Sequence, residues 1–189
     1  MAKKTYRRYY RRYFYNRNKI MRNYFKAKLD TVQKVLWTGD GVKFITGGTS
    51  TNKPIPTLLQ LCPDWESWRL LFHSFKLTGL SVEVAPNYPS ATNGQAEFTG
   101  AAVLALLTSR DANNWNNASE ANFMFMLSPA QVQRKYKSFN GGLAAWTGTD
   151  TITDLDGKFV VQSDGNPNAN SAVAFTIRFT FYVTFKNSN

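Results

Sequence analysis

The last strand-like run of the sequence constrains the fold more than any other feature. Over residues 172–186, apolar residues alternate with mostly polar ones, and phenylalanine is common at the apolar positions. A period of two places every second side chain on the same face of a β-strand. A strand with so large an apolar face belongs in the middle of a sheet, buried against a second sheet. We therefore predict a two-sheet β-sandwich with this strand central in one sheet.

The rest of the chain reads as short apolar or alternating runs divided by clusters of Gly, Asn, Pro, Ser and Asp, which is typical of an all-β domain. The predicted strands span residues 27–37, 42–46, 76–85, 96–108, 122–127, 133–139, 158–162 and 172–186. Eight strands is the number found in a jelly roll. We predict a single eight-stranded jelly roll over residues 29–189, preceded by a tail, because 189 residues suit one domain and not two.

One helix interrupts the β pattern at "DWESWRLLFHSF", residues 64–75, with Asp64 as a plausible N-cap. Its apolar residues recur at helical spacing. These residues are Trp65, Trp68, Leu71, Phe72 and Phe75.

The net charge of +11 lies entirely at the N-terminus, where residues 1–28 carry eleven cations and no acid. The remainder has 12 basic and 12 acidic residues. The eleven cations are Lys3, Lys4, Arg7, Arg8, Arg11, Arg12, Arg17, Lys19, Arg22, Lys26 and Lys28. A neutral body with a cationic arm is expected of a protein that holds a polyanion, so we interpret residues 1–28 as a nucleic-acid-binding arm. A solvated tail that aids solubility is the alternative, and such runs often also serve nuclear localisation.

The arm alternates arginine pairs with aromatic pairs, as in "YRRYYRRYFY" at residues 6–15. At about 100° per residue, the rings and the arginines separate onto opposite faces of a helix. We predict an amphipathic helix over roughly residues 5–27 that forms on assembly, since like charges at i, i+4 disfavour it in isolation. The alternative is a flexible arm whose rings, including Tyr9, Tyr10 and Tyr13, stack on unpaired bases.

A second basic patch lies at "QRKYK", residues 133–137, with Arg134, Lys135 and Lys137. Strand alternation points Lys135 and Lys137 the same way, toward either nucleic acid or an ordinary solvated edge.

Residues for catalysis or metal binding are few. His73 and Cys62 are the only histidine and cysteine, and they flank the predicted helix, where packing roles are expected. Asp150, Asp154 and Asp156 lack the spacing of a calcium loop, so we expect a solvated loop. We predict no enzymatic activity, no cofactor and no metal. No apolar run reaches the roughly 18 residues that a membrane span needs, and we expect no membrane partner.

Two motifs resemble the capsid proteins of circoviruses and related small circular single-stranded DNA viruses. The first is "FKLTGLSVEVAP", and the second is the terminal "TIRFTFYVTFKN". The matching residues are Phe75, Lys76, Leu77, Leu80, Val82, Glu83, Val84 and Pro86 in the first motif and Ile177, Arg178, Thr180, Tyr182, Val183 and Phe185 in the second.

This resemblance implies a structural protein that self-assembles into a T=1 60-mer icosahedral shell around circular single-stranded DNA. Jelly-roll loops would make the subunit contacts and the outer surface that meets a host attachment factor. The protein would be found in the virion and, during assembly, in the host nucleus. Three alternatives remain: a cellular nucleic-acid-binding β-barrel, an amphipathic membrane-surface protein and a coat protein of a small RNA or satellite virus.

Overall fold

A computed structural model of the chain describes residues 24–87, 101–128, 130–140, 145–165 and 173–187, which form ten strands and four short helices. The strands are β1 (Tyr24–Thr38), β2 (Gly41–Phe44), β3 (Asn52–Pro54), β4 (Ser74–Asn87), β5 (Ala102–Leu107), β6 (Met124–Met126), β7 (Gln133–Ser138), β8 (Thr147–Gly148), β9 (Lys158–Ser163) and β10 (Val173–Lys186). The helices are α2 (Ile55–Gln60), α3 (Trp65–Leu71), α4 (Trp115–Ser119) and the 3-10 turn η2 (Ile152–Asp154). No helix among these residues is both long enough and apolar enough to cross a membrane.

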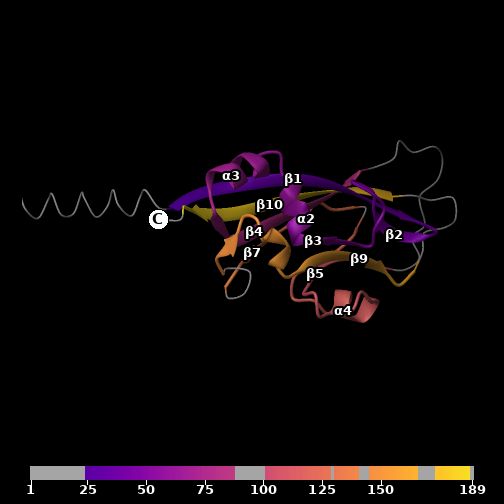
Figure 1. Cartoon of the computed structure of the whole chain (residues 1–189). Coiled ribbons are helices and arrows are strands. Elements are labelled where there is room, and N and C mark those ends of the chain that lie inside the picture. Colours follow the sequence, from indigo (N-terminus) through magenta and orange to yellow (C-terminus); the bar gives the residue numbers. More distant parts are fainter. Residues whose placement is uncertain (1–23, 88–100, 129, 141–144, 166–172, 188–189) are drawn as a thin grey trace, which may run out of the picture.

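The strands form two antiparallel sheets that pack face to face (Figure 1). The six-stranded sheet has the order β2-β1-β10-β4-β7, with β8 paired to β4. The four-stranded sheet has the order β3-β9-β5-β6. The eight predicted strands correspond to β1, β2, β4, β5, β6, β7, β9 and β10, whereas the short β3 and β8 were not predicted. The chain passes repeatedly between the two sheets. This is the predicted jelly roll.

The central position of the last strand is confirmed, because β10 lies between β1 and β4. One face of β10 is buried, and its phenylalanines meet those of the opposite sheet; the rings of Phe159 and Phe179 lie 4.7 Å apart. The other face carries Thr176, Arg178 and Thr180, which are partly or fully exposed. The period-2 pattern thus determines which side of the strand enters the core.

Helix α3 is shorter than the pattern predicted. Phe72 has an extended backbone (φ −133°, ψ 142°), and Phe75 already belongs to β4. Asp64 stands at the N-cap, but its side chain makes no capping hydrogen bond. Leu71, expected on the buried face, is 66% exposed. The helix buries Trp65 and partly buries Trp68, because it covers the end of the apolar face of β10, where Trp68 stacks on Phe185 at 5.0 Å.

The predicted boundary between arm and body also needs correction. β1 begins at Tyr24, and its first residues pair with the end of β10, from Tyr24 opposite Lys186 to Lys28 opposite Tyr182. The helix prediction is therefore wrong for residues 24–27, where pairing with β10 satisfies the backbone groups that a helix would have bonded internally. The rest of that prediction lies outside the described residues.

Candidate nucleic-acid interface

The outer faces of the two sheets are unlike each other. On the four-stranded sheet, Val103, Ala105 and Val160 are fully buried because α4 packs over them through Ala118. Figure 1 shows α4 beside β5 and β9, on the side away from the other sheet. The side chain of Asn114 caps this helix by accepting a hydrogen bond from the backbone N–H of Asn117 at 3.0 Å. These residues form a small second core under α4.

Within the described ranges, no helix packs over the outer face of the six-stranded sheet, which we call the basic face. The pairing register brings cations from five strands onto it. Its cations are Lys26, Lys28, Lys34, Lys43, Lys76, Arg134, Arg178 and Lys186. Among the described strand residues that point to this face, the carboxylates are Asp30 and Glu83. A surface with this excess of positive charge attracts a polyanion.

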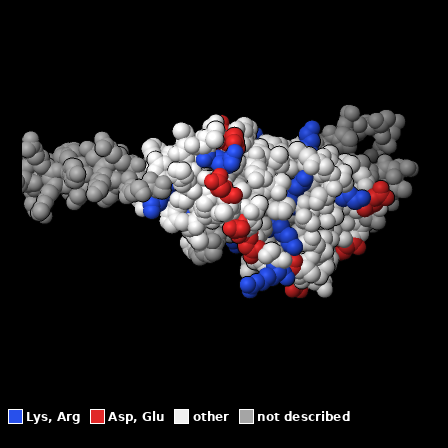
Figure 2. Space-filling model, viewed as in Figure 1, with Lys and Arg blue, Asp and Glu red and all other residues white. Residues whose placement is uncertain are grey.

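The cations of the basic face form no ion pair with a described carboxylate. Among the described residues, the ion pairs within 4 Å are those of Arg69, with Glu66 and Asp150. Arg69 lies on α3 and not on the basic face. The side shown in Figure 2 has cations and carboxylates interleaved around wide uncharged areas. The basic face therefore differs from that side in its charge balance.

Aromatic rings lie among these cations. The ammonium group of Lys28 is 5.4 Å from the ring centre of Tyr182, which in turn lies 5.6 Å from the ring of Tyr136. At the end where β1 begins, Lys76 and Lys186 hold their ammonium groups 5.1 and 5.9 Å from the ring centre of Trp146. Rings beside cations are the combination that binds single-stranded nucleic acid, through stacking and phosphate contacts.

The structure brings only some of the predicted binding residues together. Lys26 and Lys28, assigned to the arm, lie on β1 and on the basic face. The other predicted arm residues lie outside the described residues. They are Lys3, Lys4, Arg7, Arg8, Tyr9, Tyr10, Arg11, Arg12, Tyr13, Arg17, Lys19 and Arg22.

The second predicted patch is divided between two surfaces. Arg134 lies on the basic face, where its Nε donates to the Ser81 hydroxyl at 3.3 Å. Lys135 and Lys137 point the same way, as expected, but to the opposite side of β7, with their ammonium groups over the rings of Phe125 and Phe123. The Lys135 ammonium also donates to the Met124 carbonyl. The prediction that all three residues form a single patch is therefore wrong, because the period of two along β7 places Arg134 on one side and both lysines on the other.

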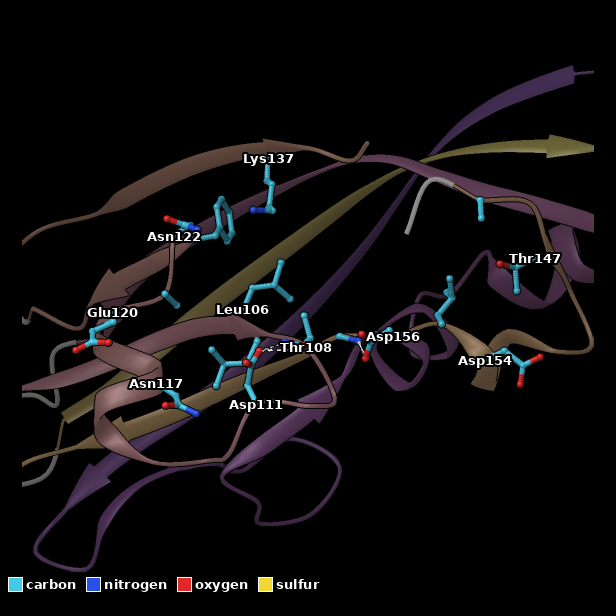
Figure 3. A pocket seen from close by; sticks show the side chains of 16 residues that line it. Leu106, Thr108, Asp111, Asn117, Glu120, Asn122, Lys137, Thr147, Asp154 and Asp156 are labelled. Atoms are coloured by element: carbon cyan, nitrogen blue, oxygen red, sulfur yellow. Dashed lines mark hydrogen bonds between the residues drawn. The ribbon is translucent and has the colours of Figure 1, made fainter. Parts of the chain in front are cut away.

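A separate hollow of about 840 Å³ lies between α4, η2 and the ends of β5 and β7 (Figure 3). Its carboxylates hold the loops in place. Asp111 accepts from the Thr108 N–H and hydroxyl at 2.7 and 2.8 Å, and Asp156 accepts from the Ser109 N–H at 2.6 Å. These hydrogen bonds lower the pKa of both carboxyl groups. Asp111 and Asp156 are therefore anions that stabilise the loops around the hollow.

The three aspartates considered as a calcium loop do not gather. Asp156 binds backbone N–H groups, Asp154 lies at the rim of the hollow (Figure 3), and Asp150 lies 3.6 Å from Arg69. Within the described ranges, no group of three or more His, Cys, Asp or Glu residues is placed to hold a metal ion.

Cys62 and His73 do not form a nucleophile and base pair. The Cys62 thiol is buried and donates to the Leu58 carbonyl at 3.5 Å, and burial raises its pKa to about 12. His73 is exposed at the start of β4, so the packing role expected for it is wrong. A thiol protonated at neutral pH is a poor nucleophile.

Comparisons with known proteins show the same fold in viral shells. No family model matches the sequence, and no curated protein matches it. The decameric BFDV capsid protein shares 13% identity at a TM-score of 0.51, over 87% of this chain and 99% of its own. The structure of Cocksfoot mottle virus shares 12% identity at a TM-score of 0.58, and the match covers 88% of this chain and 97% of that one. A semi-empty particle of the giant freshwater prawn Macrobrachium rosenbergii nodavirus shares 10% identity at a TM-score of 0.52, and the match covers 88% of this chain and 83% of that one.

At these identities the comparisons show the fold alone. The chain has the jelly roll found in viral capsid proteins, and the match extends over nearly the full length of two of these structures. The likeness therefore describes the whole body of the protein, not a single motif.

Proposed function

We propose that this chain is a viral capsid protein that self-assembles into a small icosahedral shell and packages nucleic acid through its N-terminal arm. The observation that carries the proposal is a jelly roll whose first strand continues directly from the basic arm onto a basic sheet face. A shell protein needs this arrangement, because the charge that binds the genome must lie on one side of the wall.

The finer points of the proposal follow from the sequence motifs. We favour circular single-stranded DNA as the packaged molecule, a T=1 60-mer as the shell, the virion as the final location and the host nucleus as the place of assembly. Loops between the strands would supply the subunit contacts and the surface for a host attachment factor. The role is structural, with no enzymatic activity.

A cellular nucleic-acid-binding β-barrel is the second candidate. The basic face favours it as much as it favours a capsid, because either protein would use such a surface. The two differ in assembly, since only a capsid protein forms a closed particle of megadalton mass.

The test is purification of the full chain, with size measured by light scattering and shape by electron microscopy. We expect closed particles containing nuclease-protected nucleic acid that a single-strand-specific DNase degrades after extraction. A monomer or small oligomer under all assembly conditions would reject the capsid role. Particles filled with RNA would retain that role and reject the DNA assignment.

The arm is tested by replacing Arg7, Arg8, Arg11 and Arg12 with glutamine in the full chain. This change leaves β1 intact, whereas deleting residues 1–28 would also remove the strand residues from Tyr24 onward. We expect far less protected nucleic acid per particle. An unchanged content would show that the arm does not bind the genome.

A further inference from the structure

Tyr136 is placed as an exposed ring on the basic face and not as a packing residue. It lies on β7, an edge strand, and is 60% exposed. Its position depends on Gly79 of β4, because a Cβ atom at position 79 would lie 2.3 Å from the Tyr136 hydroxyl oxygen. The missing side chain leaves the space over β4 into which the ring leans.

The same gap joins two rings from strands that are not neighbours. β4 separates β7 from β10, yet the rings of Tyr136 and Tyr182 approach to 5.6 Å in an edge-to-face arrangement. Gly79 pairs directly with Tyr182 in the register. The two tyrosines therefore form a ring pair above Gly79, the position of β4 that has no side chain.

Two shallow hollows flank this ring pair. One, of about 380 Å³, is lined by Lys26, Lys28 and both tyrosines. The other, of about 250 Å³, is lined by the cations Lys28, Arg134 and Arg178, by Tyr182, and by the two carboxylates of the basic face, Asp30 and Glu83, so it keeps an excess of one positive charge. Each hollow therefore has at least one ring and at least two cations in its wall. This combination suits a ligand with alternating flat and anionic parts.

We propose that the basic face is a stacking platform for unpaired bases, with Tyr136 and Tyr182 contacting base rings and Lys28, Arg134 and Arg178 contacting phosphates. The inference deepens the proposed function, on which its biological role rests, because it adds a site on the body to the one assigned to the arm. It also specifies the ligand. Bases in a duplex are stacked on their neighbours and cannot use a tyrosine ring, whereas unpaired bases can.

The basic face itself argues against a protein arm as the occupant. The N-terminal arm of another copy carries cations and no acid, and eight cations against two carboxylates would repel it. An anionic lipid surface also matches the charge and can accept interfacial tyrosines, so vesicle binding is measured as the competing outcome.

The experiment uses the full chain and compares Tyr136→Leu with Tyr136→Phe. The probes are a fluorescent oligo(dT) and a duplex of equal length, titrated at several salt concentrations. Tyr136→Leu should weaken oligo(dT) binding by about fivefold to 100-fold, as expected for one lost stacking contact, with the salt dependence unchanged. Tyr136→Phe should bind oligo(dT) as the parent does, and neither change should alter duplex binding.

A second variant addresses the geometry without removing the ring. Gly79→Ala should displace Tyr136 and weaken oligo(dT) binding, with circular dichroism showing that the sheets remain folded. The proposal is overturned if Tyr136→Leu binds oligo(dT) like the parent or weakens duplex binding equally. It is also overturned if phosphatidylserine vesicles bind the parent and lose as much affinity with this variant. Particle formation, followed by electron microscopy, tests the capsid role separately, so either proposal can fail alone.

Discussion

The two outer faces of the sandwich come from similar strands but have opposite surroundings. β5 and β9 are buried on both sides, and their sequences "AVLALL" and "KFVVQS" contain continuous apolar runs. β1 and β10 are buried on one side only, and their sequences alternate. All four strands bury the side that faces the core, and they differ on the outer side. The outer side of β5 and β9 is apolar and packs under α4, whereas the outer side of β1 and β10 is polar and open to a charged ligand.

The largest expected effect comes from placing the same charge on each outer face. Val103→Lys would bury an ammonium group under α4, where Val103 is 0% exposed, and should lower the free energy of unfolding by about 3 kcal/mol or more. Val32→Lys is the matched control, because Val32 is 45% exposed on the basic face, and it should change stability by less than about 0.5 kcal/mol. Urea unfolding followed by tryptophan fluorescence measures both. Equal losses would mean that the two faces do not differ as described.

A smaller effect, on the salt dependence of nucleic-acid binding, is expected from replacing one arginine on the basic face and one beside the four-stranded sheet. Arg178→Gln should reduce the dependence of log affinity on log salt for oligo(dT) by about 0.7, the value for one lost phosphate contact with a single strand. Arg110→Gln makes the same charge change at an exposed position after β5, beside the four-stranded sheet, and should leave the slope unchanged. A fluorescence titration at four salt concentrations is sufficient. If the two variants behave alike, binding follows net charge and not the basic face.

Removing the N-cap of α4 tests whether the helix that covers the four-stranded sheet contributes to stability and not to binding. Asn114→Ala loses the hydrogen bond to the Asn117 N–H and should cost about 1 kcal/mol of stability. Asn116→Ala, on the exposed side of the same helix, keeps the cap and serves as the control. Nucleic-acid affinity should be equal in both variants. A loss of affinity in Asn114→Ala would link the covered face to binding.

The last prediction concerns Cys62, which belongs to neither outer face and has no effect at neutral pH on the comparison between them. Because the folded pKa is raised to about 12, the thiol's contribution to stability is complete below its ordinary pKa of 9.0. The contribution is lost as the pH rises from 9 toward 12, since the unfolded chain ionises first. At neutral pH the thiol should react with a thiol-specific dye only after denaturation. Rapid labelling of the folded protein would contradict its burial.

The sequence by itself determined the fold class and the side of each long strand that enters the core. Alternation over residues 172–186 predicted the central strand, because a period of two acts locally and needs no partner. The same alternation places Arg178, Tyr182 and Lys186 on one face of β10, a local signal from which part of the basic face can be predicted. The short β3 and β8 gave no readable pattern, since two or three residues contain too few repeats.

Only the tertiary structure decided which residues share a surface. Lys28, Gly79, Tyr136 and Tyr182 are far apart in the sequence, and strand order and register alone bring them together. The separation of Arg134 from Lys135 and Lys137, by contrast, needs no register, because the period of two along β7 alone produces it. The register also extends β1 back to Tyr24, where the helical pattern of the arm had suggested otherwise. Hydrogen bonds to another strand are non-local, so no local pattern reports them.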